Sequence, residues 1–506
     1  MTQRPRYRAL IGIVVLAATM VGAPAVAAAP PTAAICDART NDNHKKLLEC
    51  VTLAGVREHQ QAFQDIADAN GGTRASGQPG YEASVEYVVE RMTAAGYDVF
   101  RHEFPFVYVP PAVLQQLTPI AATYDTGAFT GTGYADVTGA VTPVDLQLGL
   151  GNSSSSGCEA ADFAGFSVGT VALLQRGTCS FAIKALNAEA AGASAAVIFN
   201  QGDADTQARM DLIVGTLGGT NVVGIPVVGA SYPNGVALAQ AGATARVKVD
   251  PPQDIVVENV IAQSKSGDPN NVVMAGAHLD SVQRGPGIND NGSGSAAILE
   301  VAEQLAKAKV RNQLRFAWWG AEEAGLIGST AYVNGLSQAE KDKIALYLNF
   351  DMVGSPNHVF FIYDGDDSDA VGFGPGPAGS AQIEKTFERF FDGRGVPYKG
   401  TDFSGRSDYG PFIASMIPSG GLFTGAEGVK TAQEASIWGG TAGQQYDPCY
   451  HLACDTYANN NNTALDVNAD AIAYATLQYA MSTTDVNAVR GKGNFKVPPP
   501  EVPPTQ

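Results

Sequence analysis

The sequence is poor in charge, and positive charge is the scarcer kind. Lys and Arg together number 32 in 506 residues, against 50 Asp and Glu, and charged residues make up only 16% of the chain. Nucleic-acid binding needs a basic stripe that attracts phosphates. None occurs, and the net charge of -18 therefore argues against a nucleic-acid partner. Apolar residues, at 45%, supply material for a large core and exclude general disorder.

The apolar run at the N-terminus is too short to span a membrane. It extends from Ala9 to Val21, follows three arginines and precedes small residues near Ala27, whereas a bilayer requires roughly 20 apolar residues. The pattern predicts a cleaved signal peptide over residues 1–27 and a secreted protein. A retained anchor is the alternative. Cys36 follows Ile35 and not the small residue that precedes a lipid-modified cysteine, so release is favoured over tethering.

Cysteine is also scarce, with six residues in the whole chain. In an exported protein six cysteines indicate disulfides, although several connectivities are open. A cysteine zinc site is the competing interpretation, but no CxxC pair occurs. Proximity along the chain favours three local pairs: Cys36–Cys50, Cys158–Cys179 and Cys449–Cys454.

The chain is too long for a single typical core and predicts two or three domains. Residues 28–114 carry helical spacing followed by a strand. Residues 115–252 change to short runs of Val, Ala, Gly and Thr, which indicate an inserted, mostly β domain. Residues 253–488 form the main α/β part, and the proline-rich tail 489–506 is expected to be extended.

Strands and helices alternate in the main part, which predicts an α/β sandwich. One predicted helix would expose Glu303 and Lys307 as a pair four residues apart. The predicted strands are Asn271–Ala277, Leu314–Trp318 and Leu346–Phe350, and the predicted helices are Ser293–Lys309 and Leu326–Leu336.

Acidic and imidazole side chains follow each of the three strands. His278 and Asp280 follow the first, Glu322 and Glu323 the second, and Asp351 the third. Ligands bind outside the carboxyl ends of such strands, so these side chains should converge. A lone histidine there is usually only a polar residue, but adjacent buried glutamates repel unless a cation or a shared proton compensates. The Asp280 carboxylate could accept the second ring N–H of His278.

Asp290 lies in a glycine-bounded turn that opens the next helix, Gly287–Gly292. It could be a helix N-cap, which is common, or a metal ligand. The motifs downstream favour the ligand.

These motifs resemble metallopeptidase family 28, in the family's order and spacing and over nearly the whole mature chain. The resemblance implies a three-layer sandwich with a mixed, mostly parallel sheet, which is the zinc exopeptidase fold. Within the insertion, Gly177–Phe181 with Lys184 and Asn187 resembles a protease-associated domain; an unrelated β-rich insertion is the alternative. The matching segments are His278–Ser281, Gly287–Gly294, Ala321–Ser329, Asn349–Met352, Gly405–Tyr409 and Cys449–His451.

The resemblance also implies a site with two zinc ions. One ion would bind His278 and Asp351, the other Glu323 and His451, and Asp290 would bridge them. Imidazole and carboxylate ligands suit zinc and leave a position open for water or substrate.

Further roles follow from the same resemblance. Glu322 would be the general base, and Tyr450 would donate to the substrate carbonyl oxygen. Glu322, Asp351 and the backbone carbonyl of Arg406 would hold the substrate's α-amine, although a surface salt bridge is the simpler interpretation of the Arg406 side chain. A Cys449–Cys454 disulfide would stiffen the loop that carries Tyr450 and His451.

The predicted function is a secreted, monomeric aminopeptidase acting on peptides with a free N-terminus, with a preference for large hydrophobic residues such as Leu. A carboxypeptidase of the same fold would need a cationic pocket, and an inactive receptor-like protein should have lost ligands. Asp466 and Asp470 match a structural calcium site of some relatives, although two aspartates near a helix start also favour its N-terminus without an ion.

Overall fold

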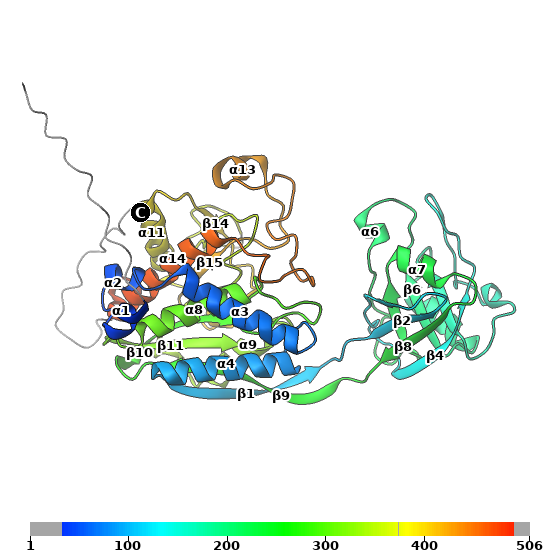
Figure 1. Ribbon diagram of the computed structural model, residues 1–506, viewed down its shortest axis with the longest axis horizontal. Coiled ribbons are helices and arrows are strands. Elements are labelled where there is room, and N and C mark those ends of the chain that lie inside the picture. Colours follow the sequence, from blue (N-terminus) through cyan, green and yellow to red (C-terminus); the bar gives the residue numbers. More distant parts are fainter. Residues whose placement is uncertain (1–32, 373, 490–506) are drawn as a thin grey trace, which may run out of the picture.

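The computed structural model describes residues 33–372 and 374–489, which form two bodies joined by a long two-stranded ribbon (Figure 1). The predicted signal peptide 1–27 and almost all of the proline-rich tail lie outside the described residues. Within the described ranges, no helix combines the length and apolar character that crossing a bilayer requires.

The larger body is built on an eight-stranded mixed sheet with the order β1-β9-β11-β10-β12-β15-β13-β14. Its central strands β11, β10, β12 and β15 run parallel. The strands are β1 Asp98–Tyr108, β9 Gln253–Gln263, β10 Asp268–His278, β11 Asn312–Trp319, β12 Ile344–Phe350, β13 Phe361–Tyr363, β14 Lys399–Thr401 and β15 Ser419–Phe423.

Helices cover both faces of this sheet, because its central strands are apolar on both sides. On β11, Phe316 and Trp318 pack into the core of one face, and Ala317 and Trp319 into that of the other. The first face carries α2 His44–Leu48, α3 Leu53–Ala69, α4 Pro79–Ala95, α8 Gly292–Leu305, α11 Ser380–Arg394 and α14 Asn462–Met481. The second carries α9 Ile327–Gly335 and α12 Tyr409–Ala414. Short helices complete the body: α1 Ala33–Ala38, α10 Gln338–Lys341, α13 Ala432–Trp438 and α15 Thr484–Asn487. The predicted three-layer fold is confirmed.

One surface detail of the sequence prediction is wrong. Helix α8 ends at Leu305, so Lys307 lies beyond it and does not form a helical pair with Glu303. Arg91 of α4 instead donates to both carboxylate oxygens of Glu303, at 2.6 and 2.8 Å. A bidentate guanidinium contact is stronger than an exposed pair within one helix.

The smaller body is a seven-stranded sheet with the order β3-β2-β8-β4-β5-β6-β7. Its two hydrophobic clusters contain residues of this body alone. The strands are β2 Val113–Thr118, β3 Ala122–Tyr124, β4 Ala135–Pro143, β5 Val171–Gln175, β6 Ala195–Phe199, β7 Val227–Ala230 and β8 Thr244–Val249. The helices are α5 Phe181–Ala190, α6 Gln207–Met210, α7 Tyr232–Leu238 and a 3-10 turn at Ala160–Phe163.

Strands β1 and β9 connect the two bodies as a continuous antiparallel ribbon (Figure 1). The pairing persists to the last residues, where Tyr108 faces Gln253. Beyond the ribbon, Arg284 of the larger body forms an ion pair with Asp125 of the smaller one.

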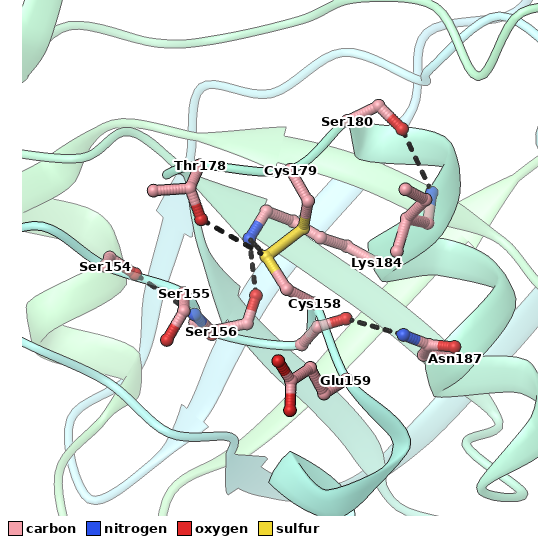
Figure 2. The surroundings of a disulfide bond; sticks show 12 residues. Ser154, Ser155, Ser156, Cys158, Glu159, Thr178, Cys179, Ser180, Lys184 and Asn187 are labelled. Atoms are coloured by element: carbon pink, nitrogen blue, oxygen red, sulfur yellow. Dashed lines mark hydrogen bonds between the residues drawn. A yellow bond between two sulfur atoms is a disulfide. The ribbon is translucent and has the colours of Figure 1, made fainter.

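Figure 2 shows how side chains of α5 hold the loop beside the Cys158–Cys179 disulfide. The buried Lys184 donates from Nζ to the carbonyl of Ser156, and Asn187 donates to the carbonyl of Gly157 at 3.0 Å. Burial lowers the pKa of Lys184 to about 8. Lys184 and Asn187, which both lie on α5, thus fix the loop that carries Cys158.

The other two disulfides, Cys36–Cys50 and Cys449–Cys454, also join the pairs that chain proximity favours. The second closes a short loop that contains Tyr450 and His451. No free cysteine remains among the described residues.

Candidate active site

The side chains named from the sequence meet at the carboxyl edge of the central strands. His278 Nε2 lies 3.2 Å from Asp290 Oδ1 and 3.3 Å from Asp351 Oδ1. His451 Nε2 lies 3.2 Å from Asp290 Oδ2 and 3.0 Å from Glu323 Oε2. Asp290 therefore presents one carboxylate oxygen to each histidine.

This arrangement fits two metal ions. A tetrahedral zinc with N and O ligands at about 2.0–2.1 Å holds its donor atoms about 3.3 Å apart, and the four distances above match that spacing. In addition, Asp351 Oδ1 and Glu323 Oε1 are buried without a hydrogen-bond partner. A buried carboxylate oxygen of this kind is costly unless a cation compensates its charge.

The electrostatics point the same way. Burial lowers the pKa of His451, but hydrogen bonds to Asp290 and Glu323 outweigh it and raise the pKa to about 10. Burial also lowers the pKa of His278, yet Glu322 and its other carboxylate neighbours raise it well above its usual value. The cluster favours positive charge between these side chains.

The helix N-cap alternative for Asp290 is excluded by its neighbour. Asn291 is the N-cap of α8, and its Oδ1 accepts from the backbone N–H of Gly294 at 2.9 Å. The carboxylate of Asp455 accepts from the backbone N–H groups of Asn289 and Asp290, at 2.8 and 2.9 Å. Asp455 thus fixes the backbone while the Asp290 side chain faces the histidines.

The predicted partner of His278, Asp280, lies beside the second ring nitrogen. His278 Nδ1 lies 3.1 Å from the backbone carbonyl of Asp280, whereas the Asp280 carboxylate is 3.6 Å away. That carboxylate also accepts from the backbone N–H of Glu322 at 3.2 Å. Asp280 therefore adjoins His278 with both its carbonyl and its carboxylate, and the carboxylate also holds the Glu322 segment.

Arg74 is a supporting residue that sequence reasoning missed. Fully buried, it donates to three carbonyls of the loop after His278, those of Leu279, Pro286 (2.9 Å) and Gly287 (2.6 Å). Burial lowers its pKa to about 10, so it remains a cation near neutral pH. It lies about two hundred positions before the loop, and no local motif could connect them.

Ser407 is a second supporting residue. It lies in the Gly405–Tyr409 motif, but the sequence alone assigns it no role. Its hydroxyl donates to Asp351 Oδ2 at 2.6 Å and accepts from Asn349 at 2.8 Å. With Oδ2 engaged, the other carboxylate oxygen of Asp351 faces His278.

A cavity of about 110 Å³ opens on these groups, and Glu322 and Tyr450 both line it. Glu322 Oε2 lies 3.9 Å from His278 Nε2. Burial raises the pKa of Glu322 well above its usual value, against the opposing effect of His278, and the Asp351 charge adds to the rise. Burial likewise raises the pKa of Tyr450, so its hydroxyl stays protonated and can donate.

The Arg406 side chain is an exposed salt-bridge partner. It donates to Glu427 at 2.7 Å and to the Tyr450 hydroxyl at 3.3 Å. The salt-bridge interpretation therefore holds for its guanidinium.

In two other clusters of acidic side chains, a positively charged side chain of the protein already binds a carboxylate. Arg394 donates to Asp470 at 2.5 Å in the predicted calcium region. His59 Nε2 lies 3.8 Å from Glu303 and 4.0 Å from Glu300, which is looser than the active cluster, and Arg91 already binds Glu303.

Sequence comparison agrees with the fold. Residues 259–476 match peptidase family M28, and residues 137–238 match the PA domain. An aminopeptidase of Pseudomonas aeruginosa is 51% identical over 454 residues, covering 87% of this chain and 83% of that protein. The probable lipoprotein aminopeptidase LpqL of Mycobacterium tuberculosis is 45% identical, covering 87% of both chains. Leucine aminopeptidase 2 of Trichophyton rubrum is 42% identical, covering 85% and 84%.

Solved structures show the same fold. An aminopeptidase from Aneurinibacillus sp. strain AM-1 superposes with a TM-score of 0.54 at 28% identity, over 91% of this chain and 99% of that one. A zinc aminopeptidase from Bacillus subtilis gives a TM-score of 0.58 at 24% identity, over 85% and 95%.

Fold, site and relatives together define a metallo-aminopeptidase. The chain belongs to peptidase family M28 and carries a PA domain as an insertion.

Proposed function

We propose that this protein is a secreted aminopeptidase with two zinc ions, which removes N-terminal residues from peptides and prefers large hydrophobic ones such as Leu. The observation that carries the proposal is the shared carboxylate. Asp290 offers Oδ1 to one histidine–carboxylate pair and Oδ2 to another.

In this proposal His278 and Asp351 would hold one zinc, Glu323 and His451 would hold the other, and Asp290 would be their shared ligand. When bound, the ions act as Lewis acids and lower the pKa of a bound water to near 7.

The chain's own residues move the protons. Glu322, which lines the cavity 3.9 Å from His278 Nε2, would accept a proton from the attacking water and deliver it to the departing amine. The protonated hydroxyl of Tyr450 donates to the substrate carbonyl oxygen as negative charge develops there.

Substrate orientation follows from charge. The cationic α-amine of the substrate would be held by Glu322, Asp351 and the backbone carbonyl of Arg406. The enzyme would therefore cleave the peptide bond that follows the N-terminal residue. A carboxypeptidase would need a cation for the α-carboxylate, and the one arginine that lines the cavity, Arg406, is bound by Glu427.

Export, domain limits and assembly are part of the same proposal. A signal peptide over residues 1–27 and a PA domain over 115–252 fit a released, disulfide-bonded monomer. Because Cys36 is bonded to Cys50, it offers no thiol for lipid attachment. Calcium at Asp466 and Asp470 stays a prediction, and Arg394 competes with it for Asp470.

The Glu322→Gln variant tests the mechanism. It should lose hydrolysis of a leucyl chromogenic substrate while retaining two zinc ions, because the base is removed and the ligands are not. Turnover comparable to the wild type would refute the role of Glu322. Glu340→Gln, on the surface helix α10, is the matched control and should behave as wild type. An N-acetylated substrate should resist the wild-type enzyme.

A further inference from the structure

A row of side-chain hydrogen bonds leads from the core of the larger body to Asp351. Trp319 Nε1 donates to the hydroxyl of Tyr347 at 2.8 Å, and that hydroxyl donates to Asn349 Oδ1 at 3.0 Å. Asn349 Nδ2 then donates to the hydroxyl of Ser407 at 2.8 Å, which donates to Asp351 Oδ2 at 2.6 Å. We call these five buried residues the Asp351 chain.

The two ends of the Asp351 chain fix the direction of every bond in it. The indole N–H of Trp319 can only donate, and the carboxylate of Asp351 can only accept. The Tyr347 oxygen therefore accepts from the indole, and its own hydrogen goes to Asn349. The amide must then present Nδ2 to Ser407, whose hydrogen is left for Asp351. Burial raises the pKa of Tyr347 well above its ordinary value, so the hydroxyl keeps the hydrogen that it donates.

The surrounding fold is shaped to hold Trp319 and Tyr347 together. A Cβ placed on Gly276 of β10 would lie 2.5 Å from the Tyr347 hydroxyl oxygen and 2.7 Å from Trp319 Nε1. Glycine within a strand often marks such a close approach, and at this position it leaves room for the first bond of the chain. The Tyr347 ring also stacks on Phe412 of α12, with centroids 3.9 Å apart and planes only 2° from parallel. These contacts keep the phenol oxygen between the indole and Asn349.

The far end of the chain divides the work of the two carboxylate oxygens of Asp351. Ser407 binds Oδ2, whereas Oδ1 lies 3.3 Å from His278 Nε2. A donor that stays on Oδ2 prevents the carboxylate from rotating and so keeps Oδ1 directed towards His278. Partners of this kind, behind the ligands themselves, orient the ligands of a metal site.

We propose that Tyr347 is a positioning residue for Asp351 and, through it, for one of two zinc ions. The proposal rests on the two-zinc site proposed above. Without the Tyr347 hydroxyl, the bond that directs Asn349 Oδ1 away from Ser407 is lost and the amide can turn over. Ser407 would then donate to Asn349, leaving Asp351 Oδ2 without a donor. The Tyr363 hydroxyl also interacts with the Asn349 side chain, but it can donate or accept and therefore does not fix the direction of the amide.

The test measures the zinc affinity of Tyr347→Phe by metal-buffered titration. The variant keeps the stacked ring and should bind one of the two zinc ions about tenfold more weakly, the smaller of the usual costs of losing a partner that orients a ligand. Tyr332→Phe is the matched control, because Tyr332 packs beside Trp319 with centroids 5.2 Å apart and its hydroxyl accepts from Arg315, outside the Asp351 chain. The control should keep wild-type zinc affinity even where its stability falls.

A double-mutant cycle tests whether Tyr347 acts through Ser407. Ser407→Ala removes the donor to Asp351 directly, so that adding Tyr347→Phe should change the zinc affinity by less than about twofold. If the two residues acted independently, their separate losses of affinity would multiply. Multiplied losses would therefore overturn the proposal. If Ser407→Ala binds no zinc, the comparison of Tyr347→Phe with Tyr332→Phe decides.

A zinc affinity of Tyr347→Phe equal to that of the wild type would also overturn the proposal. If that variant does not fold, Asn349→Asp takes its place, because an aspartate of the same size cannot donate to Ser407. Unchanged zinc affinity in Asn349→Asp is then the overturning result. A wild-type protein that binds fewer than two zinc ions defeats the proposed function, whereas two ions in the wild type and unchanged variants defeat this inference alone.

Discussion

At the scale of single residues, Arg74 shows how much of the site lies outside the ligand set. One guanidinium holds three carbonyls of the loop that links His278 to Asp290. The ammonium of lysine is a compact point charge and cannot reproduce this planar fork. Arg74→Lys should weaken zinc affinity about 10–100-fold, the usual cost of losing a partner that orients the ligands.

Metal-buffered zinc titration followed by activity would measure this loss, and excess zinc should restore turnover. Arg57→Lys is the control, because Arg57 lies on α3 and contacts Gln60 and the carbonyl of Tyr457. Unchanged zinc affinity in Arg74→Lys would contradict the assigned role.

Tyr450 should act on the chemical step and not on zinc binding. Tyr450→Phe removes the donor to the developing oxyanion and should lower kcat about 10²–10³-fold with little change in KM. Steady-state kinetics with a leucyl substrate would test this. Tyr446→Phe, four residues earlier and bonded to Glu434, should retain kcat, and a loss limited to KM in Tyr450→Phe would speak against the donor role.

The residues that could be identified from sequence are those with distinctive chemistry beside a strand end. His278, Glu323 and Asp351 are rare or costly at such positions. Arg74 and Asp455 were not identifiable, because their partners lie far away in the chain and are backbone groups that any residue possesses. A motif records side chains, whereas these two residues bind main chain.

At the scale of elements, β10 shows why strand limits were underestimated. The sequence predicted Asn271–Ala277, but pairing extends from Asp268 to His278. Polar residues at a strand end join the ladder through the backbone, which hydropathy does not report. For α8 the error was in the other direction: the sequence predicted a helix that ends at Lys309, whereas α8 ends at Leu305. The Ala and Lys residues that follow Leu305 favour a helix locally, but the chain must turn there towards β11.

The packing of α3 against α8 predicts a pH effect. Burial raises the pKa of Glu300 from 4.5 to about 7, against a hydrogen bond from the Thr52 backbone. The folded state then binds more protons than the unfolded state between these values. Its stability therefore falls as pH rises through this window, by about 3 kcal/mol in full.

Glu300→Gln keeps the shape and removes the charge. The variant should unfold at higher urea than the wild type at about pH 8, and the difference should shrink at about pH 5, where Glu300 is mostly protonated in the folded state. Urea titrations at both pH values measure it. An equal difference at both would exclude Glu300 as the titrating group, with His59 and Glu303 as the neighbours to examine next.

At the scale of the whole molecule, the inserted domain was recognisable from the sequence because the residue composition changes to short runs of Val, Ala, Gly and Thr. Its separate hydrophobic clusters agree with that prediction. The ribbon of β1 and β9 was not predictable as a pair, because about 145 residues separate its ends and only the closed fold brings them together.

That ribbon allows the insertion to be removed cleanly. Tyr108 and Gln253 are antiparallel partners at its end, and an Asn-Gly turn closes such a pair directly. Replacing residues 109–252 by Asn-Gly should therefore give a folded, zinc-loaded enzyme, because both hydrophobic clusters of the larger body consist of its own residues.

The shortened enzyme should cleave a leucyl p-nitroanilide with near wild-type kcat/KM. Its kcat/KM for long peptides, relative to that small substrate, then measures how much the PA domain and its Arg284–Asp125 contact govern access. Aggregation or loss of zinc in the shortened protein would instead make the insertion part of the catalytic fold.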